Sequence, residues 1–255
     1  MKVTVCQTRD DPAGFAQDWE RLAAHLKTEA SYLVLLPEMP FAPWFAGTRQ
    51  FDSAVWQAAV IRHDEWLQRL DELAPAIVLG SRPVNRNARR LNEAFVWESS
   101  RGYRPAHEKY YLPDEDGYWE ASWYHRGDGS FSPVDTGTFR AGFLICTDLW
   151  FLERARRYGS AGVHLVCNPR ATESATGDRW LAGGRVAAVV SGAYVLSSNR
   201  AGAARPSAFG GQGWIIGPDG QVLGVTSDER PFVTVELDLS EAERAKQTYP
   251  RYVRE

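Results

Sequence analysis

Short apolar runs that stop abruptly constrain the fold of this chain more than any other feature. The runs are Tyr32–Leu36, which Pro37 ends, Phe143–Cys146, and Val163–Cys167, which is apolar except for His164. Continuous apolar runs of this length are typical of strands that are buried on both faces. The chain is therefore predicted to contain buried strands on which further layers pack.

Amphipathic segments alternate with these runs. Apolar residues recur at helical spacing over Gly14–Ala30, which predicts a helix there. The other predicted helices are 53–73, Phe151–Tyr158, Arg179–Ser191 and a last helix from Glu241 that Ser240 caps. The other predicted strands are Val3–Gln7, Ala76–Gly80, Ala94–Trp97, Tyr194–Ser198, Gly213–Ile216, Val222–Val225 and Phe232–Leu237. This alternation indicates an α/β layered protein. Because no linker or internal repeat interrupts it, we expect residues 1–255 to form a single domain.

The charge balance and the apolar content argue against several classes of protein. The 255 residues carry 29 basic and 32 acidic side chains, a net charge of −3, whereas a general nucleic-acid binder would show a basic excess. The longest mostly apolar stretch, Val186–Leu196, is shorter than the roughly 18 residues that a membrane span needs. Polar residues follow Met1 too soon for a signal peptide. We therefore expect a cytoplasmic protein with no nucleic-acid or membrane partner.

Cysteines are few: Cys6, Cys146 and Cys167. An odd number cannot pair completely and no CxxC motif is present, so we expect neither a disulfide framework nor a zinc ribbon. Their default interpretation is as small core residues in a reducing compartment.

Side chains that could take part in catalysis nevertheless lie just after predicted strands or in a long loop. Glu38 comes directly after the apolar run that Pro37 ends, at the edge of a sheet where α/β proteins place ligands. Cys146 lies at a strand-to-helix turn, which would expose its thiol and let a helix N-terminus favour the thiolate. Lys109 opens a long polar and aromatic segment that extends to Arg140. Loops of that length in compact domains are usually functional.

These three residues support one mechanism. A thiol needs a base to become a nucleophile, and Glu38 could supply it. Lys109 could stabilise the oxyanion of a tetrahedral intermediate. The same physics also permits a cysteine–histidine pair, as in papain-like hydrolases, that would use one of the histidines His107, His125 and His164.

The order and spacing of these blocks resemble the nitrilase, or carbon–nitrogen hydrolase, superfamily over nearly the whole chain. The matching blocks are Gln7, Leu36–Glu38, Lys109–Pro113, Tyr118–Glu120, Gly142–Asp148, Phe151, Glu153, Asn168–Pro169, Ser198–Arg200, Gly213–Gly220 and Glu236–Asp238. The resemblance implies a four-layer α-β-β-α sandwich with a Glu–Lys–Cys triad. In that triad Glu38 would be the general base, Lys109 the oxyanion stabiliser and Cys146 the nucleophile. The backbone N–H of Thr147 would complete the oxyanion hole, and Glu120 would orient the lysine and the substrate nitrogen.

The resemblance also implies an activity. It implies hydrolysis of a non-peptide C–N bond in a small linear amide or N-carbamoyl compound, through a thioester, with release of ammonia or an amine and without a metal or organic cofactor. Members commonly assemble as dimers or larger, so a homo-oligomer is expected. Asp148 stands where true nitrilases typically have glutamate, which favours amides over nitriles. A nitrilase that forms a carboxylic acid, and a non-catalytic interaction protein on the same fold, remain the alternatives.

The substrate is less well defined. Thr147 replaces an aromatic residue common in carbamoylases, and Leu149 and Trp150 stand where some carbamoyl-amino-acid hydrolases carry arginines. Sites are commonly lined by aromatic side chains with few polar groups. We therefore expect pocket walls from Tyr118, Trp119 and Trp150. Arg170 is a candidate for binding an anionic substrate, with an exposed structural arginine as its alternative.

Overall fold

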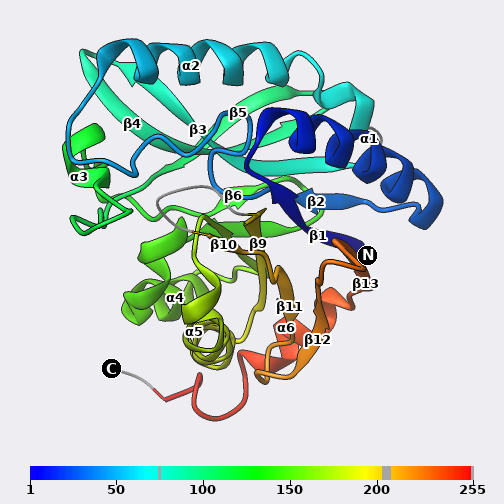
Figure 1. Ribbon diagram of the computed structural model, residues 1–255. Coiled ribbons are helices and arrows are strands. Elements are labelled where there is room, and N and C mark those ends of the chain that lie inside the picture. Colours follow the sequence, from blue (N-terminus) through cyan, green and yellow to red (C-terminus); the bar gives the residue numbers. More distant parts are fainter. Residues whose placement is uncertain (74–75, 203–207, 254–255) are drawn as a thin grey trace.

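Two layers of strands lie at the centre of the computed structural model, which describes residues 1–73, 76–202 and 208–253 (Figure 1). The first layer contains β1 (Lys2–Arg9), β2 (Leu33–Leu35), β3 (Ile77–Arg86), β4 (Arg89–Glu98), β5 (Gly102–Glu108) and β13 (Phe232–Glu236). The second contains β6 (Val134–Asp135), β7 (Arg140–Phe143), β8 (Leu165–Arg170), β9 (Tyr194–Gly202), β10 (Phe209–Gly210), β11 (Trp214–Ile216) and β12 (Val222–Val225).

Strand β1 joins the two layers. Its first part pairs with β2 in parallel and with β13 in antiparallel register. Its last residues, Gln7–Arg9, pair in parallel with Asn199–Ala201 of β9 in the second layer. Since the layers share a hydrogen-bonded strand, the segments that follow β2 and β8 are held close together, and Glu38 N–H donates to the Arg170 carbonyl.

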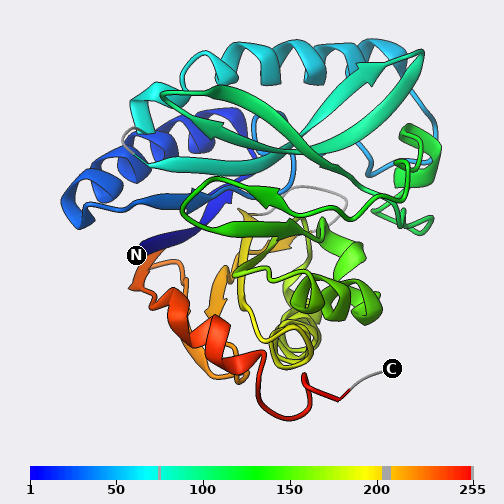
Figure 2. The same cartoon turned by 180° about the vertical axis from the view of Figure 1, so that it is seen from behind.

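Helices cover both outer faces (Figures 1 and 2). The helices α1 (Pro12–Glu29) and α2 (Ser53–Leu67) lie on the first layer, and α4 (Leu152–Ser160), α5 (Gly177–Ser191) and α6 (Leu239–Ala245) lie against the second. Shorter helical turns are α3 (Glu120–Trp123), η1 (Leu70–Leu73), η2 (Cys146–Trp150) and η3 (Ser174–Thr176). The predicted four-layer α-β-β-α sandwich is confirmed. None of the helices in the described ranges is long and apolar enough to cross a membrane.

The apolar runs bury both faces of their strands, as their composition predicts. In β2, Leu33 and Leu35 belong to the core between the two strand layers. Val34 and Leu36 instead pack with Trp19 of α1 in the core between the sheet and its helices. Side chains alternate along a strand, so one continuous run supplies two cores and leaves the residues just past it free for function.

Several strands have bounds that differ from the predicted ones. Some extend past the apolar residues into polar ones. The strands predicted over Ala76–Gly80 and Ala94–Trp97 are parts of the longer hairpin β3–β4, whose two turn residues have positive φ angles of 50° and 60°. Strand β5 was not predicted, because its mixed composition hides the alternation. In contrast, the strand predicted to reach Cys146 ends at Phe143, and Cys146 already belongs to η2.

Two predicted helices also differ from the structure. The segment 53–73 is not one helix, because α2 ends at Leu67 and the chain re-forms as η1. This break lets Leu70 and Leu73 reach the core cluster that contains Trp66. The last helix is capped by Asp238, whose carboxylate accepts from the Ser240 N–H, and not by Ser240.

Helices α4 and α5 approach closely at Gly159, so a substitution there tests how these helices pack. A Cβ at Gly159 of α4 would lie 2.3 Å from the Ser191 carbonyl oxygen at the end of α5. We expect Gly159→Ala to lower the free energy of unfolding by about 1–3 kcal/mol, because backbone cannot yield as a flexible side chain does. Urea unfolding measures the change, and Ser160→Ala at the exposed neighbouring position should stay within about 0.5 kcal/mol. Equal stabilities for the two variants would contradict this packing.

Candidate active site

A buried ion-pair cluster joins two residues that follow strands to the first residue of a short helix. Glu38 follows β2, Lys109 follows β5 and Glu120 begins α3. The Lys109 ammonium lies 2.8 Å from Glu38 Oε1 and 2.5 Å from Glu120 Oε2, and the side chains of all three residues are fully buried. The long segment that begins at Lys109 thus folds back so that Glu120 reaches the same ammonium group.

Cys146 occupies a strained position beside this cluster. It is the first residue of η2, its φ angle is +45° and it is only 3% exposed. A left-handed conformation is unfavourable for a residue with a side chain, and such strain persists only where the surroundings impose it. The side-chain amide of Asn168 donates to the carbonyls of Leu144 and Cys146, at 2.5 and 3.2 Å, and so helps to fix this turn.

Burial dominates the ionisation of the thiol. Burial raises the pKa of Cys146 above its ordinary value and the charge of Glu38 raises it further, while the charge of Lys109 lowers it. Cys146 is therefore a neutral thiol at pH 7. The sequence-based expectation that the turn would favour the thiolate is wrong for this resting state, because desolvation outweighs the local dipoles.

The two carboxylates and the ammonium set one another's charge. Burial alone would lower the pKa of Lys109, but the charges of Glu120 and Glu38 outweigh it and the net shift is upward, so the ammonium stays protonated. Burial raises the pKa of Glu120 to about 7, against the lowering effect of Lys109. Tyr124 O–H donates to Glu120 Oε2.

Among the described residues, the carboxylates of Glu38 and Glu120 each have one oxygen that is hydrogen-bonded and one that is not. Glu38 Oε1 accepts from Lys109 and, at 2.7 Å, from the amide of Asn92. Within the described part of the chain, Glu38 Oε2 and Glu120 Oε1 are buried without a hydrogen-bond partner. An orphaned buried acceptor is costly, so these oxygens are candidates to receive a proton or a substrate N–H group.

Asp148 fastens the Lys109 segment to the Cys146 turn. Its carboxylate accepts from the backbone N–H groups of Ile145, Tyr110 and Tyr111 at 3.2, 3.3 and 3.0 Å. It also lies 2.9 Å from Nε2 of His107. The donors come from both sides of Lys109 and from the residue before Cys146, so one buried side chain sets the separation of these two residues.

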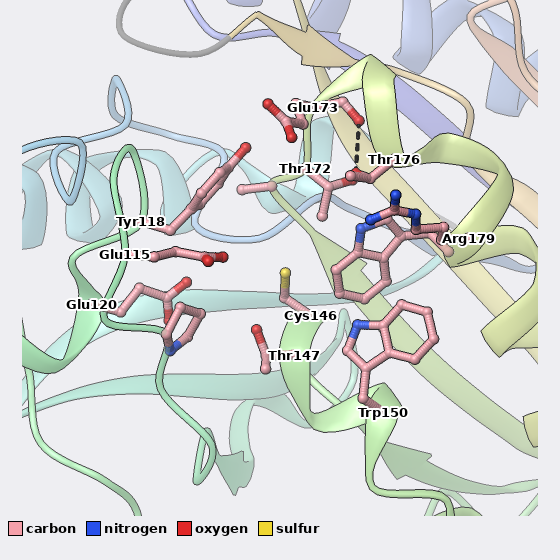
Figure 3. Close-up of a pocket in the computed structure, with 13 residues that line it drawn as sticks. Glu115, Tyr118, Glu120, Cys146, Thr147, Trp150, Thr172, Glu173, Thr176 and Arg179 are labelled. Atoms are coloured by element: carbon pink, nitrogen blue, oxygen red, sulfur yellow. Dashed lines mark hydrogen bonds between the residues drawn. The ribbon is translucent and has the colours of Figure 1, made fainter.

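A cavity of about 280 Å³ opens above Cys146 (Figure 3). Its walls come from the loop before α3, from η2, and from the segment that leads from β8 into α5. The lining residues are Pro113, Glu115, Tyr118, Glu120, Cys146, Thr147, Trp150, Ala171, Thr172, Glu173, Thr176, Arg179 and Trp180. A small molecule in this cavity would therefore meet the thiol and Glu120 together.

Sequence comparison places this geometry among known proteins. The model of the carbon–nitrogen hydrolase family matches residues 2–247. The chain belongs to the carbon–nitrogen hydrolase family. It is 31% identical to the chloroplastic omega-amidase of Arabidopsis thaliana over 184 residues, which cover 68% of this chain and 49% of that protein, so the match spans about half of that relative. It is also 25% identical to the N-carbamoylputrescine amidase of the same plant over 246 residues, covering 88% of this chain and 82% of the relative.

A solved structure shows the same fold. The carbon–nitrogen hydrolase of Helicobacter pylori G27 superposes with a TM-score of 0.83 at 21% identity, covering 98% of this chain and 94% of that one.

The structure brings most of the predicted site residues of this carbon–nitrogen hydrolase together. Tyr118, Glu120, Thr147 and Trp150 line the cavity with Cys146. Glu38 and Lys109 do not line the cavity, but Lys109 contacts both Glu38 and the lining residue Glu120 through its ammonium group.

Two other predicted residues lie elsewhere among the described residues. Trp119 packs at the edge of the aromatic cluster around Trp123, and Arg49 lies over its ring at 5.2 Å. Arg170 is neither exposed nor on the cavity wall. It is 1% exposed and donates to Ser197, Thr172 and Gln212. Each of its three guanidinium nitrogens thus donates to a partner within the protein, which argues against Arg170 as a substrate-binding residue.

No histidine lines the cavity within the described ranges. His107 lies within hydrogen-bond distance of Asp148 and of the Ser130 carbonyl through its two ring nitrogens. His125 lies beside the Arg90 backbone, and His164 lies 2.5 Å from Glu243 at the surface. The cysteine–histidine alternative therefore has no support in this geometry.

Sequence reasoning missed several functional candidates. Asn92 lies inside the hairpin β3–β4, and nothing in its sequence neighbourhood distinguishes it from other strand asparagines. Glu173 and Arg179 read as ordinary solvated charges, and only the fold reveals that they line the cavity. Within the described residues, no cluster of three or more His, Cys, Asp or Glu side chains is placed to hold a metal ion.

Replacing Asp148 tests whether it fastens the two site segments. We expect Asp148→Asn to lower the free energy of unfolding by about 2–4 kcal/mol, because the amide NH₂ would meet donors where a carboxylate oxygen accepted. Urea unfolding measures the change. The exposed Asp71→Asn is the matched control and should lie within about 0.5 kcal/mol of the parent. A parent-like Asp148→Asn would show that its hydrogen bonds do not set the geometry.

Proposed function

We propose that this protein is a cysteine-dependent hydrolase of the C–N bond in a small linear amide or N-carbamoyl compound. The observation that carries the proposal is the buried Glu38–Lys109–Glu120 cluster, whose Glu120 lines the same cavity as Cys146. Membership in the carbon–nitrogen hydrolase family supports it, as do the omega-amidase and carbamoylputrescine amidase relatives. These relatives favour an amide or carbamoyl substrate over the nitrile alternative.

The first half of the proposed reaction forms a thioester. Glu38 takes the thiol proton of Cys146, and the sulfur attacks the carbonyl carbon of the substrate. The oxyanion is stabilised by the Lys109 ammonium and the backbone N–H of Thr147. The intermediate then collapses, the C–N bond breaks, and the departing nitrogen takes the proton from Glu38 and leaves as ammonia or an amine.

The second half releases the acid. Water gives a proton to Glu38 and attacks the thioester carbon. The C–S bond breaks, the acid leaves, and the proton returns to sulfur. Glu120 receives an N–H of the substrate at its unpartnered Oε1 and holds Lys109 through Oε2. Each proton transfer to or from Glu38 leaves the net charge of the buried site unchanged.

Three further expectations are part of this proposal. Residues 1–255 act as one carbon–nitrogen hydrolase domain, since the family match extends over 2–247. The chain forms a homo-oligomer of two or more copies, which sedimentation at micromolar concentration can test. The cytoplasmic location expected from the sequence stays a prediction, as does the expectation that no cofactor takes part.

Removing the thiol tests the nucleophile. We expect Cys146→Ala to reduce kcat/KM for ammonia release from simple amides by about 10⁴-fold or more, because no acyl-enzyme can form. Cys167→Ala is the matched control. Cys167 is a buried thiol of β8 that lies outside the cavity lining, so its loss should change kcat/KM little. If the two variants hydrolyse amides equally well, the assignment of Cys146 is wrong.

The ionisation of Glu120 predicts a pH dependence. Burial raises the pKa of Glu120 to about 7, so its carboxylate is present above this pH and is lost as the pH falls through it. We therefore expect kcat/KM to decline on the acid side of pH 7, because a neutral Glu120 holds Lys109 less firmly. Glu120→Gln should lower kcat/KM at pH 8 and abolish this acid limb. An unchanged profile in that variant would exclude Glu120 as its source.

A further inference from the structure

The cavity carries charges that the proposed reaction does not use. Glu115, Glu173 and Arg179 line it, and none of their charged groups forms an ion pair among the residues that the structure describes. Glu173 is half-buried, whereas Glu115 and Arg179 are exposed at the mouth. Arg179 is the only lysine or arginine of the described lining, since Lys109 does not line the cavity.

These charges lie on different sides of the thiol. Figure 3 shows Glu115 and Tyr118 on one side of Cys146 and Arg179 with Trp150 on the other, while Glu173 lies above. Arg179 belongs to the first turns of α5, a helix of 15 residues, whose N-terminal partial charge adds to that of the guanidinium. The cavity is therefore cationic on the side of Arg179 and anionic across from it at Glu115 and above it at Glu173.

The apolar part of the lining lies beside the cationic wall. Trp150 and Trp180 have ring centroids 5.0 Å apart, and the Trp150 ring is 43% exposed. Such rings suit the methylene groups of a short linear substrate. The volume of about 280 Å³ limits that substrate to a small molecule.

We infer that the substrate carries both an ammonium and a carboxylate group at the end remote from its amide, as in the ω-amide or ω-ureide of a small α-amino acid. The inference rests on the proposed function. The carboxylate would face Arg179 and the ammonium would face Glu173, with Glu115 adding to the negative potential. A substrate with only a carboxylate would leave both glutamates without a counter-charge, and one with only an ammonium would meet Arg179. Charges of both signs around the cavity thus select against a substrate that carries only one of them.

The reaction at the amide group is the one proposed above. Water is consumed, the C–N bond of the ω-amide breaks, and ammonia leaves. The product is an amino acid with a new carboxylate at the former amide carbon. That product has a second negative charge, which would lie beside Cys146 and Glu120 and favour its release.

Four compounds that share the butanamide chain isolate the two charges. Glutamine carries both, 4-aminobutanamide lacks the carboxylate, glutaramate (4-carbamoylbutanoate) lacks the ammonium, and butanamide lacks both. We expect kcat/KM for glutamine to exceed that for each singly charged compound by about three- to tenfold, the size expected for partly solvated ion pairs. Ammonia release is the readout for all four.

Two substitutions locate the groups. Arg179→Gln should reduce the glutamine to 4-aminobutanamide ratio about three- to tenfold, and Glu173→Gln should reduce the glutamine to glutaramate ratio similarly. Arg185→Gln is the matched control. Arg185 lies on the same helix but donates to the Gly220 carbonyl at 3.0 Å, outside the cavity lining, so both ratios should stay unchanged.

The outcomes separate the inference from the proposed function. Hydrolysis of butanamide at the rate of glutamine, or a singly charged compound that is preferred to glutamine, would overturn the inference and leave the hydrolase proposal intact. Ratios that stay within twofold in Arg179→Gln and Glu173→Gln would also overturn it. Failure to release ammonia from all four amides and from citrulline would overturn the proposed function itself.

Discussion

The burial of Lys109 between Glu38 and Glu120 is the interaction on which the rest of the site depends. Removing an ion from water costs about several kcal/mol even after relaxation, so this cluster persists only because short hydrogen bonds and rigid chain segments hold its members together. In the proposed mechanism, the cluster also allows a thiol whose pKa is raised by burial to react. A proton that moves from Cys146 to Glu38 relocates a negative charge that the site already holds, and the ammonium remains close to both positions.

A second set of buried polar groups fixes the segments that carry this cluster. The guanidinium of Arg200 donates to the backbone carbonyls of Glu38 and Met39 and forms a buried ion pair with Asp10. The Asp148 carboxylate likewise accepts hydrogen bonds from the backbone beside Lys109 and before Cys146. Glu38, Lys109 and Cys146 thus each follow a strand, in a segment whose backbone is held by a buried charged side chain. This arrangement accounts for charged residues in a core that would otherwise favour apolar ones.

The α/β alternation and the positions of Glu38 and Cys146 at strand ends could be predicted from local patterns, whereas the four layers and the role of Lys109 were implied by the resemblance to the carbon–nitrogen hydrolase superfamily. Continuous apolar runs mark buried strands, and residues just past such runs reach the functional edge of a sheet. Strand β5 and the outer half of the hairpin β3–β4 were missed because polar residues continue there into solvent. Arg170 illustrates the remaining limit. Its sequence neighbourhood indicates a charge near the site, but whether it meets solvent, substrate or its own core is decided by Ser197 and Gln212, which are distant in sequence.

The measurement that tests the central claim most directly is the intact mass of the protein after rapid acid quenching during turnover of a simple amide, followed by peptide mapping. If the buried cluster activates the thiol, the quenched protein carries the acyl group of the substrate, and the modified peptide contains Cys146. Glu38→Gln should then form this adduct far more slowly, because the thiol has lost its base. Turnover without any acyl adduct, or an adduct on another residue, would contradict the account.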